Sequence, residues 1–211
     1  MAQNKSTQPK QTVRQNASQD ENWGIEAVKT IGLSLLLAFG IRTFVAEARY
    51  IPSGSMEPTL LINDRLIVDK VSYRFGEPDR GDIVVFNPTD ALRSQGFKDA
   101  FIKRVIGLPG DNVEIRQGQV LINGQVLDEA YTADERSTSV ETCVYSGVKN
   151  PYLEKLQTIP NEHYLVLGDN RQNSFDGRCW GLVARSDLVG RAVFRFWPIP
   201  RVGLISDQAR L

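Results

Sequence analysis

Three short segments of the sequence carry side chains that could perform nucleophilic catalysis. In the first, residues 51–60, Ser53 and Ser55 flank Gly54 between two prolines. Glycine and the prolines favour a tight, extended backbone that can present one hydroxyl and leave nearby N–H groups unpaired. Unpaired N–H groups beside a nucleophilic hydroxyl are what an oxyanion site requires. The alternative interpretation is an ordinary Ser-Gly-Ser turn.

The second segment, residues 101–107, has a lysine inside an apolar strand. The alternation of side chains places Lys103 on one face with Phe101 and Val105, whereas Arg104 points to the opposite face. Burial disfavours the charged form of an ammonium group, so a lysine among apolar neighbours can be neutral near pH 7 and act as a base. The alternative is a strand lysine whose head group reaches solvent.

The third segment, residues 165–178, predicts a strand that runs into a loop rich in hydrogen-bonding side chains. Loops on a rigid scaffold often carry site residues. A metal-binding loop is the alternative, because Asp169, Asn170 and Asp176 supply oxygen ligands. Their spacing differs from that of an EF-hand calcium loop, and the sequence predicts no helix pair around them.

Histidine offers little to such a mechanism. Any Ser-His or Cys-His mechanism would have to use His163, the one histidine of the chain, which precedes an apolar run and is expected to be a structural strand residue. Ser146 and Lys149 match the Ser-x-x-Lys pattern of penicillin-recognising enzymes. The helix and companion motifs of those enzymes are missing, so we interpret this match as chance.

The composition excludes several other functions. The 211 residues include 25 Lys+Arg, 25 Asp+Glu and two cysteines, and 41% are hydrophobic. This balance and length suit one globular domain, alone or with an appendage. The formal net charge of zero argues against nucleic acid as a partner. Two cysteines are too few for a four-thiolate zinc site or a disulfide framework.

The elements that must position these segments begin with a tail and an apolar helix. Residues 1–22 are rich in Gln and Asn and predict a disordered cytoplasmic tail. Residues 23–48 predict a transmembrane anchor, with an apolar run over 31–41. A cleaved signal peptide, supported by the Ala-Glu-Ala sequence at 46–48, and a soluble core helix are the alternatives. The positive-inside rule favours a cytoplasmic N-terminus, with the bulk of the chain outside.

Residues 49–211 predict an extracytoplasmic domain that is mainly β. Short β-branched or aromatic runs bounded by turn residues lie at 65–71, 82–86, 101–107, 112–116 and 191–197. Asn123 and Gly124 stand between two alternating apolar runs, which is a strong hairpin signal. Residues 128–160 are polar and irregular and predict a long excursion from the sheet. We expect a mainly antiparallel β domain.

Together, the segments resemble those of bacterial type I signal peptidases (leader peptidases), which are membrane-anchored Ser-Lys proteases, here of the single-anchor kind. Four motifs in the family's order carry the resemblance: PSGSMEPTL (52–60), RGDIVVF (80–86), FIKRVIGLPGD (101–111) and GDNRQNSFDGR (168–178). The resemblance implies a fold of two coiled antiparallel β-sheets, and it implies no cofactor and no metal. It also implies removal of signal peptides from exported preproteins, by cutting after small residues at positions −1 and −3.

The resemblance assigns chemical roles to four residues. Ser55 would be the nucleophile, and Lys103 would be the general base, held neutral by burial. Ser53 would contribute its hydroxyl to the oxyanion hole, together with the backbone N–H of Ser55. Ser174 would hydrogen-bond to Lys103 and orient it, as the third member does in catalytic triads.

Other residues would support the site or bind substrate. Asp176 would form ion pairs with Arg178 and Arg104 that hold the loop. Shallow apolar pockets for small side chains would be lined by Ile51, Pro52, Met56, Leu60, Phe101 and Ile102. Because the domain should face an oxidising compartment, we also predict a disulfide between Cys143 and Cys179.

The expected partners are membrane lipid and the signal peptides of preproteins that emerge from translocation, and the plasma membrane is favoured over an internal one. A repressor-type Ser-Lys autoprotease is an alternative, but it would need a DNA-binding helical domain where residues 1–49 offer a tail and an apolar helix. The other alternative is a catalytically silent, membrane-anchored β domain that binds a partner. The presence of Ser53, Ser55, Lys103 and Ser174 argues against it.

Overall fold

The computed structural model describes residues 14–132 and 137–205, which divide into two units between Thr43 and Phe44. The described part of the first unit is the 31-residue helix α1 (Arg14–Phe44) without its last residue. Its segment Trp23–Phe44 is apolar and 22 residues long. At the rise of an α-helix this segment extends about 33 Å, enough to cross the hydrocarbon core of a bilayer. Helix α1 therefore fits a membrane anchor.

Helix α1 begins inside the segment that the sequence predicts to be a disordered tail. It starts at Arg14, whereas the predicted tail runs over residues 1–22, of which 1–13 lie outside the described residues. Residues 14–22 contain neither proline nor glycine, so they can extend a helix that the apolar segment has already nucleated.

The end of α1 also differs from the predicted anchor boundary at residue 48. The helix ends at Phe44, and Ala46–Tyr50 form strand β1, which pairs antiparallel with β2 (Arg65–Asp69). The Ala-Glu-Ala sequence at 46–48 thus belongs to the β unit, where its backbone takes part in a strand ladder.

The second unit is built from two sheets, and every strand pair in the described residues is antiparallel. The larger sheet has the order β1–β2–β11–β3–β4–β9–β10, with β12 paired to β11. Its other strands are β3 (Ile83–Phe86), β4 (Phe101–Gly107), β9 (His163–Leu167), β10 (Val183–Ala184), β11 (Leu188–Trp197) and β12 (Gly203–Leu204). The predicted mainly antiparallel β fold is confirmed.

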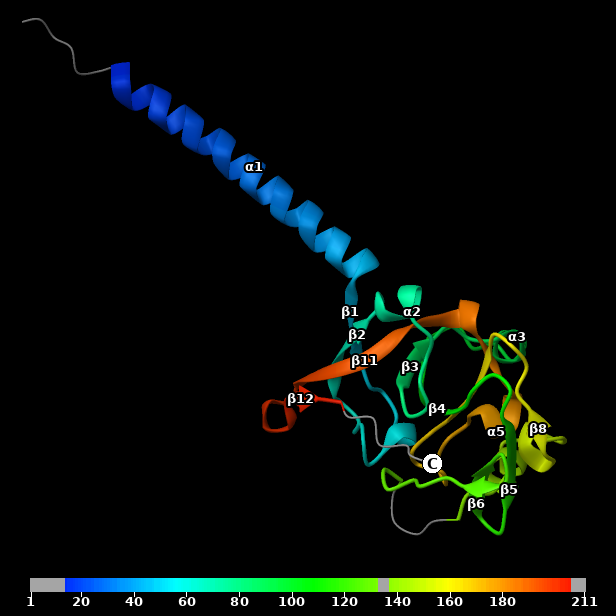
Figure 1. Cartoon of the computed structure of the whole chain (residues 1–211). Coiled ribbons are helices and arrows are strands. Elements are labelled where there is room, and N and C mark those ends of the chain that lie inside the picture. The colour runs from blue at the N-terminus through cyan, green and yellow to red at the C-terminus, as the bar shows by residue number, and fades with distance from the viewer. Residues whose placement is uncertain (1–13, 133–136, 206–211) are drawn as a thin grey trace, which may run out of the picture. The chain divides into compact units, whose positions relative to one another are not determined.

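The smaller sheet has the order β7–β6–β5–β8, and Figure 1 shows β5 and β6 at the end of the unit away from β1 and β2. Its strands are β5 (Asn112–Arg116), β6 (Gln119–Ile122), β7 (Gln125–Val126) and β8 (Gln157–Thr158). The predicted hairpin joins β6 to β7, and its turn residues Asn123 and Gly124 have φ of 53° and 81°. Two positive φ values are typical of the tight turns that match strand twist.

Short helices occupy the connections. The α-helices are α2 (Ser72–Phe75), α3 (Asp90–Ser94), α4 (Glu141–Tyr145) and α5 (Gly177–Trp180). The 3-10 helices are η1 (Gly54–Met56), η2 (Tyr152–Glu154), η3 (Arg185–Asp187) and η4 (Ile199–Arg201). The predicted excursion at 128–160 therefore contains α4, η2 and β8 as well as irregular chain.

Strand β4 separates the apolar clusters of the core. Phe101 and Val105 pack in one cluster with Phe86 and Trp180, whereas Ile102 and Ile106 belong to other clusters. Because side chains alternate along a strand, Lys103 shares the face of Phe101 and Val105. Arg104 points to the opposite face. The two cations of this strand therefore enter different environments.

Candidate active site

Ser55 and Lys103 meet in the interior of the β unit. The Nζ atom of Lys103 lies 2.8 Å from the Oγ atom of Ser55. Lys103 is 3% exposed and Ser55 is 9% exposed. Ser55 is carried by η1, whose turn is closed by the Glu57 N–H donating to the Gly54 carbonyl at 3.1 Å. Lys103 is carried by β4, which pairs with β3 on one side and β9 on the other. The nucleophile candidate and the base candidate thus stand on well-packed elements.

Burial lowers the pKa of Lys103 from 10.5 to about 8. The charges of Asp176 and Asp169 act in the opposite direction, and Arg178 lowers the pKa further. The Nζ atom also donates to the carbonyl of Ile102 at 2.9 Å, which fixes its orientation. A substantial fraction of this lysine is therefore neutral near pH 8 and able to accept a proton.

The loop after β9 holds the backbone of the Ser55 segment. The Asn170 N–H donates to the Ser55 carbonyl at 3.1 Å, and Asn170 Nδ2 donates to the Gly54 carbonyl at 3.1 Å. Gly168 permits this close approach, because a Cβ atom there would lie 2.2 Å from Ser174 Oγ and 2.5 Å from the Ser55 carbonyl oxygen. Any larger residue at position 168 would push the loop away from the serine.

Ser53 and Ser174 are close to the pair but do not bond to Lys103. The Oγ of Ser174 is buried and does not form the predicted hydrogen bond to Lys103. Ser53 is exposed, and its side chain caps no helix N–H group.

Two buried ion pairs support the loop, in a different combination from the predicted one. Asp176 pairs with Arg178 at 2.8 Å, whereas Arg104 pairs with Asp169 at 2.6 Å instead of with Asp176. Asp176 also accepts the Gly168 N–H at 2.9 Å. Burial opposes ionisation of Asp176, but Arg178 outweighs it and holds the pKa of this carboxyl below its usual value. Both carboxylates that could have suited a metal are therefore bound by arginines.

An apolar cavity of about 590 Å³ opens beside the pair. Of the six predicted pocket residues, Pro52, Phe101 and Ile102 line this cavity. The other three, Ile51, Met56 and Leu60, are 2% exposed or less and pack in a core cluster with Leu66 and Ile83. The prediction rested on their positions in the motifs, but their side chains pack in the core and not in the cavity.

Sequence reasoning missed the aromatic wall of this cavity. Phe97 and Phe175 line it, and their ring centres lie 6.0 Å apart. Phe97 also packs edge-on against Phe101 at 5.5 Å. Phe175 lies inside the third motif and could have been singled out there, whereas Phe97 lies between motifs and gave no signal.

The remaining candidates do not line the cavity beside the pair. Cys143 in α4 and Cys179 in α5 form a disulfide. His163 begins β9, its Nδ1 lies 2.8 Å from the Asn161 carbonyl oxygen, and it does not line the cavity. Lys149 is exposed in the excursion.

The chain is similar to known proteins over most of its length. Residues 24–197 match the family model described as signal peptidase, peptidase S26. A probable signal peptidase I-2 from Synechocystis sp. is 55% identical over 200 residues, covering 95% of this chain and 85% of the relative. Signal peptidase I from Leptolyngbya laminosa is 54% identical over 183 residues, covering 85% and 82%.

More distant matches include a plant protein and a crystal structure. A probable thylakoidal processing peptidase 2 of the Arabidopsis thaliana chloroplast is 35% identical over 179 residues, covering 84% of this chain and 45% of the relative. A signal peptidase I from Enterococcus faecalis, solved as a crystal structure, is 28% identical, with a TM-score of 0.37 over 55% of this chain and 97% of that one.

Proposed function

The chain belongs to the signal peptidase family, peptidase S26, and we propose that it removes signal peptides with Ser55 as nucleophile and Lys103 as general base. The observation that carries the proposal is the distance of 2.8 Å between the Lys103 amine and the Ser55 hydroxyl. A second support is the burial that lowers the pKa of Lys103 to about 8. A lysine with its ordinary pKa would be protonated near neutral pH and could not act as a base.

In the first half of the reaction, Ser55 is acylated. Neutral Lys103 takes the hydroxyl proton while Ser55 Oγ attacks the scissile carbonyl carbon, forming the C–O bond and placing negative charge on the carbonyl oxygen. When this intermediate collapses, the C–N bond breaks and the Lys103 ammonium gives its proton to the leaving amine. The mature protein departs with a new N-terminus, and the signal peptide remains as an ester on Ser55.

In the second half, water hydrolyses the ester. Lys103, neutral again, accepts a proton from the attacking water, the C–O bond to Ser55 breaks, and the proton returns to Ser55 Oγ. The signal peptide leaves with a free carboxylate. No group beyond this pair and water is required for the proton balance.

Three further groups, the backbone N–H of Ser55 and the hydroxyls of Ser53 and Ser174, would assist these steps. Ser55 lies in the first turn of η1, where a backbone N–H has no acceptor within the helix and can donate to an oxyanion. Ser53 immediately precedes η1 and lines the cavity, so its hydroxyl can provide the second donor. The buried hydroxyl of Ser174 is the candidate for orienting Lys103.

We propose that the preference for small residues at −1 and −3 arises from the packing behind Ser55. The side chains of Ile51, Met56 and Leu60 are buried in one core cluster. Pro52 and Ile102 line the cavity beside the nucleophile. Because well-packed cores do not open for larger groups, these buried side chains would limit how deeply the side chains nearest the scissile bond can enter the cavity beside Ser55.

We also propose a location for the enzyme. With α1 spanning the bilayer and its N-terminus in the cytoplasm, residues 45–54 would tether Ser55 to the outer face of the membrane, where preproteins emerge. We favour the plasma membrane over an internal one, and membrane lipid and signal peptides as partners.

Cleavage of a purified preprotein in detergent tests the reaction and its specificity. Wild type should produce one cut after an Ala-x-Ala site, read by mass spectrometry of the product termini, and Ser55→Ala should produce none. Replacing the −1 alanine of the substrate by leucine should abolish the cut. Cutting by Ser55→Ala would contradict the proposal. A folded wild type that binds preprotein without cutting it would favour the silent binding domain.

A further inference from the structure

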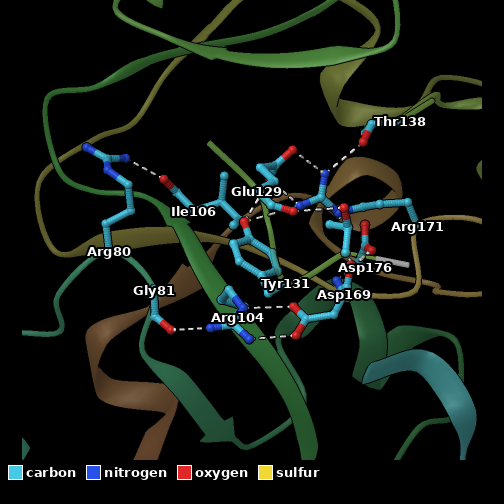
Figure 2. A network of polar contacts seen from close by, with 12 residues as sticks. Arg80, Gly81, Arg104, Ile106, Glu129, Tyr131, Thr138, Asp169, Arg171 and Asp176 are labelled. Carbon is cyan, nitrogen blue, oxygen red and sulfur yellow. Dashed lines mark hydrogen bonds and ion pairs between the residues drawn. The ribbon is translucent and has the colours of Figure 1, made fainter. Parts of the chain in front are cut away.

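A buried polar network links the excursion after β7 to the loop that holds Ser55 (Figure 2). Arg171, which is 2% exposed, donates from Nη1 to Glu129 at 2.9 Å and to Thr138 Oγ1 at 2.7 Å, and a second bond runs from Nη2 to Glu129. Its Nε donates to the Gly168 carbonyl at 3.0 Å. Arg171 therefore links Gly168, at the start of the loop after β9, to Glu129 and Thr138 in the excursion.

Tyr131 provides a second link from the excursion. Its hydroxyl donates to Glu129 at 2.7 Å, and the guanidinium carbon of Arg104 lies 4.0 Å from the centre of its ring. Figure 2 shows Arg104 between Tyr131, Gly81 and Asp169. The guanidinium donates to both carboxylate oxygens of Asp169, at 2.8 and 2.6 Å. The ring thus limits the positions from which Arg104 can bind the loop.

The two links converge on one residue. Asp169 and Arg171 are the neighbours of Asn170 in the chain, and Asn170 makes the two hydrogen bonds to the Ser55 and Gly54 carbonyls. Asp169 also accepts the hydroxyl of Thr59, in the same segment as Ser55, at 2.6 Å. The loop is therefore fixed on both sides of the contact that holds the nucleophile.

We infer that Glu129 and Tyr131 are positioning residues for the cleavage reaction, acting through Arg171 and Arg104 to hold Asn170 against the backbone of Ser55. This inference rests on the proposed function of Ser55 and Lys103. Neither Glu129 nor Tyr131 lines the cavity beside the pair. Their effect is therefore on the rate of the chemical step, not on substrate binding.

Stability alone does not require these charges. Burying an ion pair costs desolvation energy that its attraction roughly offsets, so an apolar core would be about as stable. Burial opposes the charge of Arg171, but Glu129 outweighs it and raises the pKa of the guanidinium. The ion pair between Arg171 and Glu129 instead fixes the orientation of the loop. A planar guanidinium donates along fixed directions, here to Gly168, Glu129 and Thr138.

Steady-state kinetics of Glu129→Gln in the full chain test the inference. The matched control is Glu114→Gln, which makes the same change in the surface ion pair with Arg116. Glu129→Gln should lower kcat about 10- to 100-fold, with KM within about twofold of wild type, as expected for misplaced reacting groups. Glu114→Gln should leave both unchanged.

The pH profile separates positioning from general destabilisation. A loosened loop admits water to Lys103 and weakens the desolvation that lowers its pKa, while Asp176, Asp169 and Arg178 still act on it. The rising limb of kcat against pH should therefore move to higher pH in Glu129→Gln. Loss of folded protein would lower the amplitude without moving the limb. An unchanged kcat and limb in folded Glu129→Gln would overturn the inference.

Tyr131→Phe gives a second test that does not depend on the folding of Glu129→Gln. It keeps the ring against Arg104 and removes the hydroxyl that donates to Glu129 at 2.7 Å and accepts from Arg171 Nη2 at 3.5 Å, so kcat should fall a few-fold with the limb shifted in the same direction. Wild-type kinetics in folded Tyr131→Phe would overturn the role of its hydroxyl. An equal loss in Glu114→Gln and Glu129→Gln would overturn the whole inference. Failure of wild type to cut any preprotein would instead remove the proposed function.

Discussion

The amine of Lys103 and the hydroxyl of Ser55 lie 2.8 Å apart, although 48 positions separate the two residues in the sequence. Strand β4 carries the amine, and η1 carries the hydroxyl. Asn170 donates a hydrogen bond to the backbone of η1 at the Ser55 carbonyl. The short distance between the two groups therefore depends on the packing of β4, η1 and the loop after β9.

Activity should rise with pH through about 8. Burial lowers the pKa of Lys103 to about this value, and only the neutral amine can accept the Ser55 proton. Below the pKa the fraction of active enzyme falls tenfold for each unit of pH. Measuring kcat/KM against pH reports this group in the free enzyme. A profile that is flat between about pH 6 and 9 would contradict the assignment of Lys103 as the base.

Lys103→Met should make the protein more stable while it removes activity. The folded pKa of about 8 lies below the unfolded value of 10.5, so the unfolded chain binds more protons between these values, and wild-type stability rises with pH across this window. Below the window the buried amine costs about 3 kcal/mol. Methionine has a similar shape without a charge.

Denaturant unfolding at about pH 7 and pH 10 measures this effect. The free energy of unfolding of Lys103→Met should exceed that of wild type at the lower pH, and the difference should shrink at the higher pH. A constant difference between the two proteins would mean that Lys103 titrates alike in the folded and unfolded chains.

Gly168→Ala should lower both activity and stability. The new Cβ would lie 2.2 Å from Ser174 Oγ and 2.5 Å from the Ser55 carbonyl oxygen, distances that force the loop and the nucleophile apart. We expect a cost of about 1–3 kcal/mol from overpacking and a loss of kcat of about 10²-fold. Gly203→Ala is the matched control, because no atom beyond the adjoining residues lies within 4 Å of its Cβ position. Equal activity of the two variants would contradict the close approach.

Removal of the disulfide should destabilise the β unit without removing activity at low temperature. Cys143 and Cys179 enclose a loop with a sequence separation of 36, for which the chain-entropy model gives about 2–4 kcal/mol. Neither cysteine lines the cavity. Thermal unfolding of the double Cys→Ala variant should show a lower Tm, and kcat well below that Tm should stay near the wild-type value. Wild type in reductant should behave in the same way.

The sequence predicted those parts of the fold and site that depend on local pattern. Alternation along 101–107 assigned Lys103 and Arg104 to opposite faces, and Asn123 and Gly124 identified the β6–β7 hairpin. The motif at 168–178 marked the loop that contacts Ser55. Each of these features is encoded within a few residues.

Features that depend on tertiary pairing could not be predicted in this way. Nothing in the sequence shows that Arg104 binds Asp169 rather than Asp176, since both carboxylates lie in the same loop. The side chains of Ile51, Met56 and Leu60 face the core because of how η1 packs, not because of their spacing. The positioning role inferred for Glu129 and Tyr131 could not be predicted either, because both lie in a segment whose sequence shows no regular pattern.

The most direct test of the Ser-Lys mechanism is preprotein cleavage by Lys103→Ala beside wild type, with folding checked by circular dichroism and product termini read by mass spectrometry. The matched control is Lys149→Ala, which removes an exposed lysine of the excursion. We predict that wild type and Lys149→Ala cut at the same bond and that folded Lys103→Ala does not cut. Cutting by Lys103→Ala at the wild-type rate would contradict the role of Lys103 as general base.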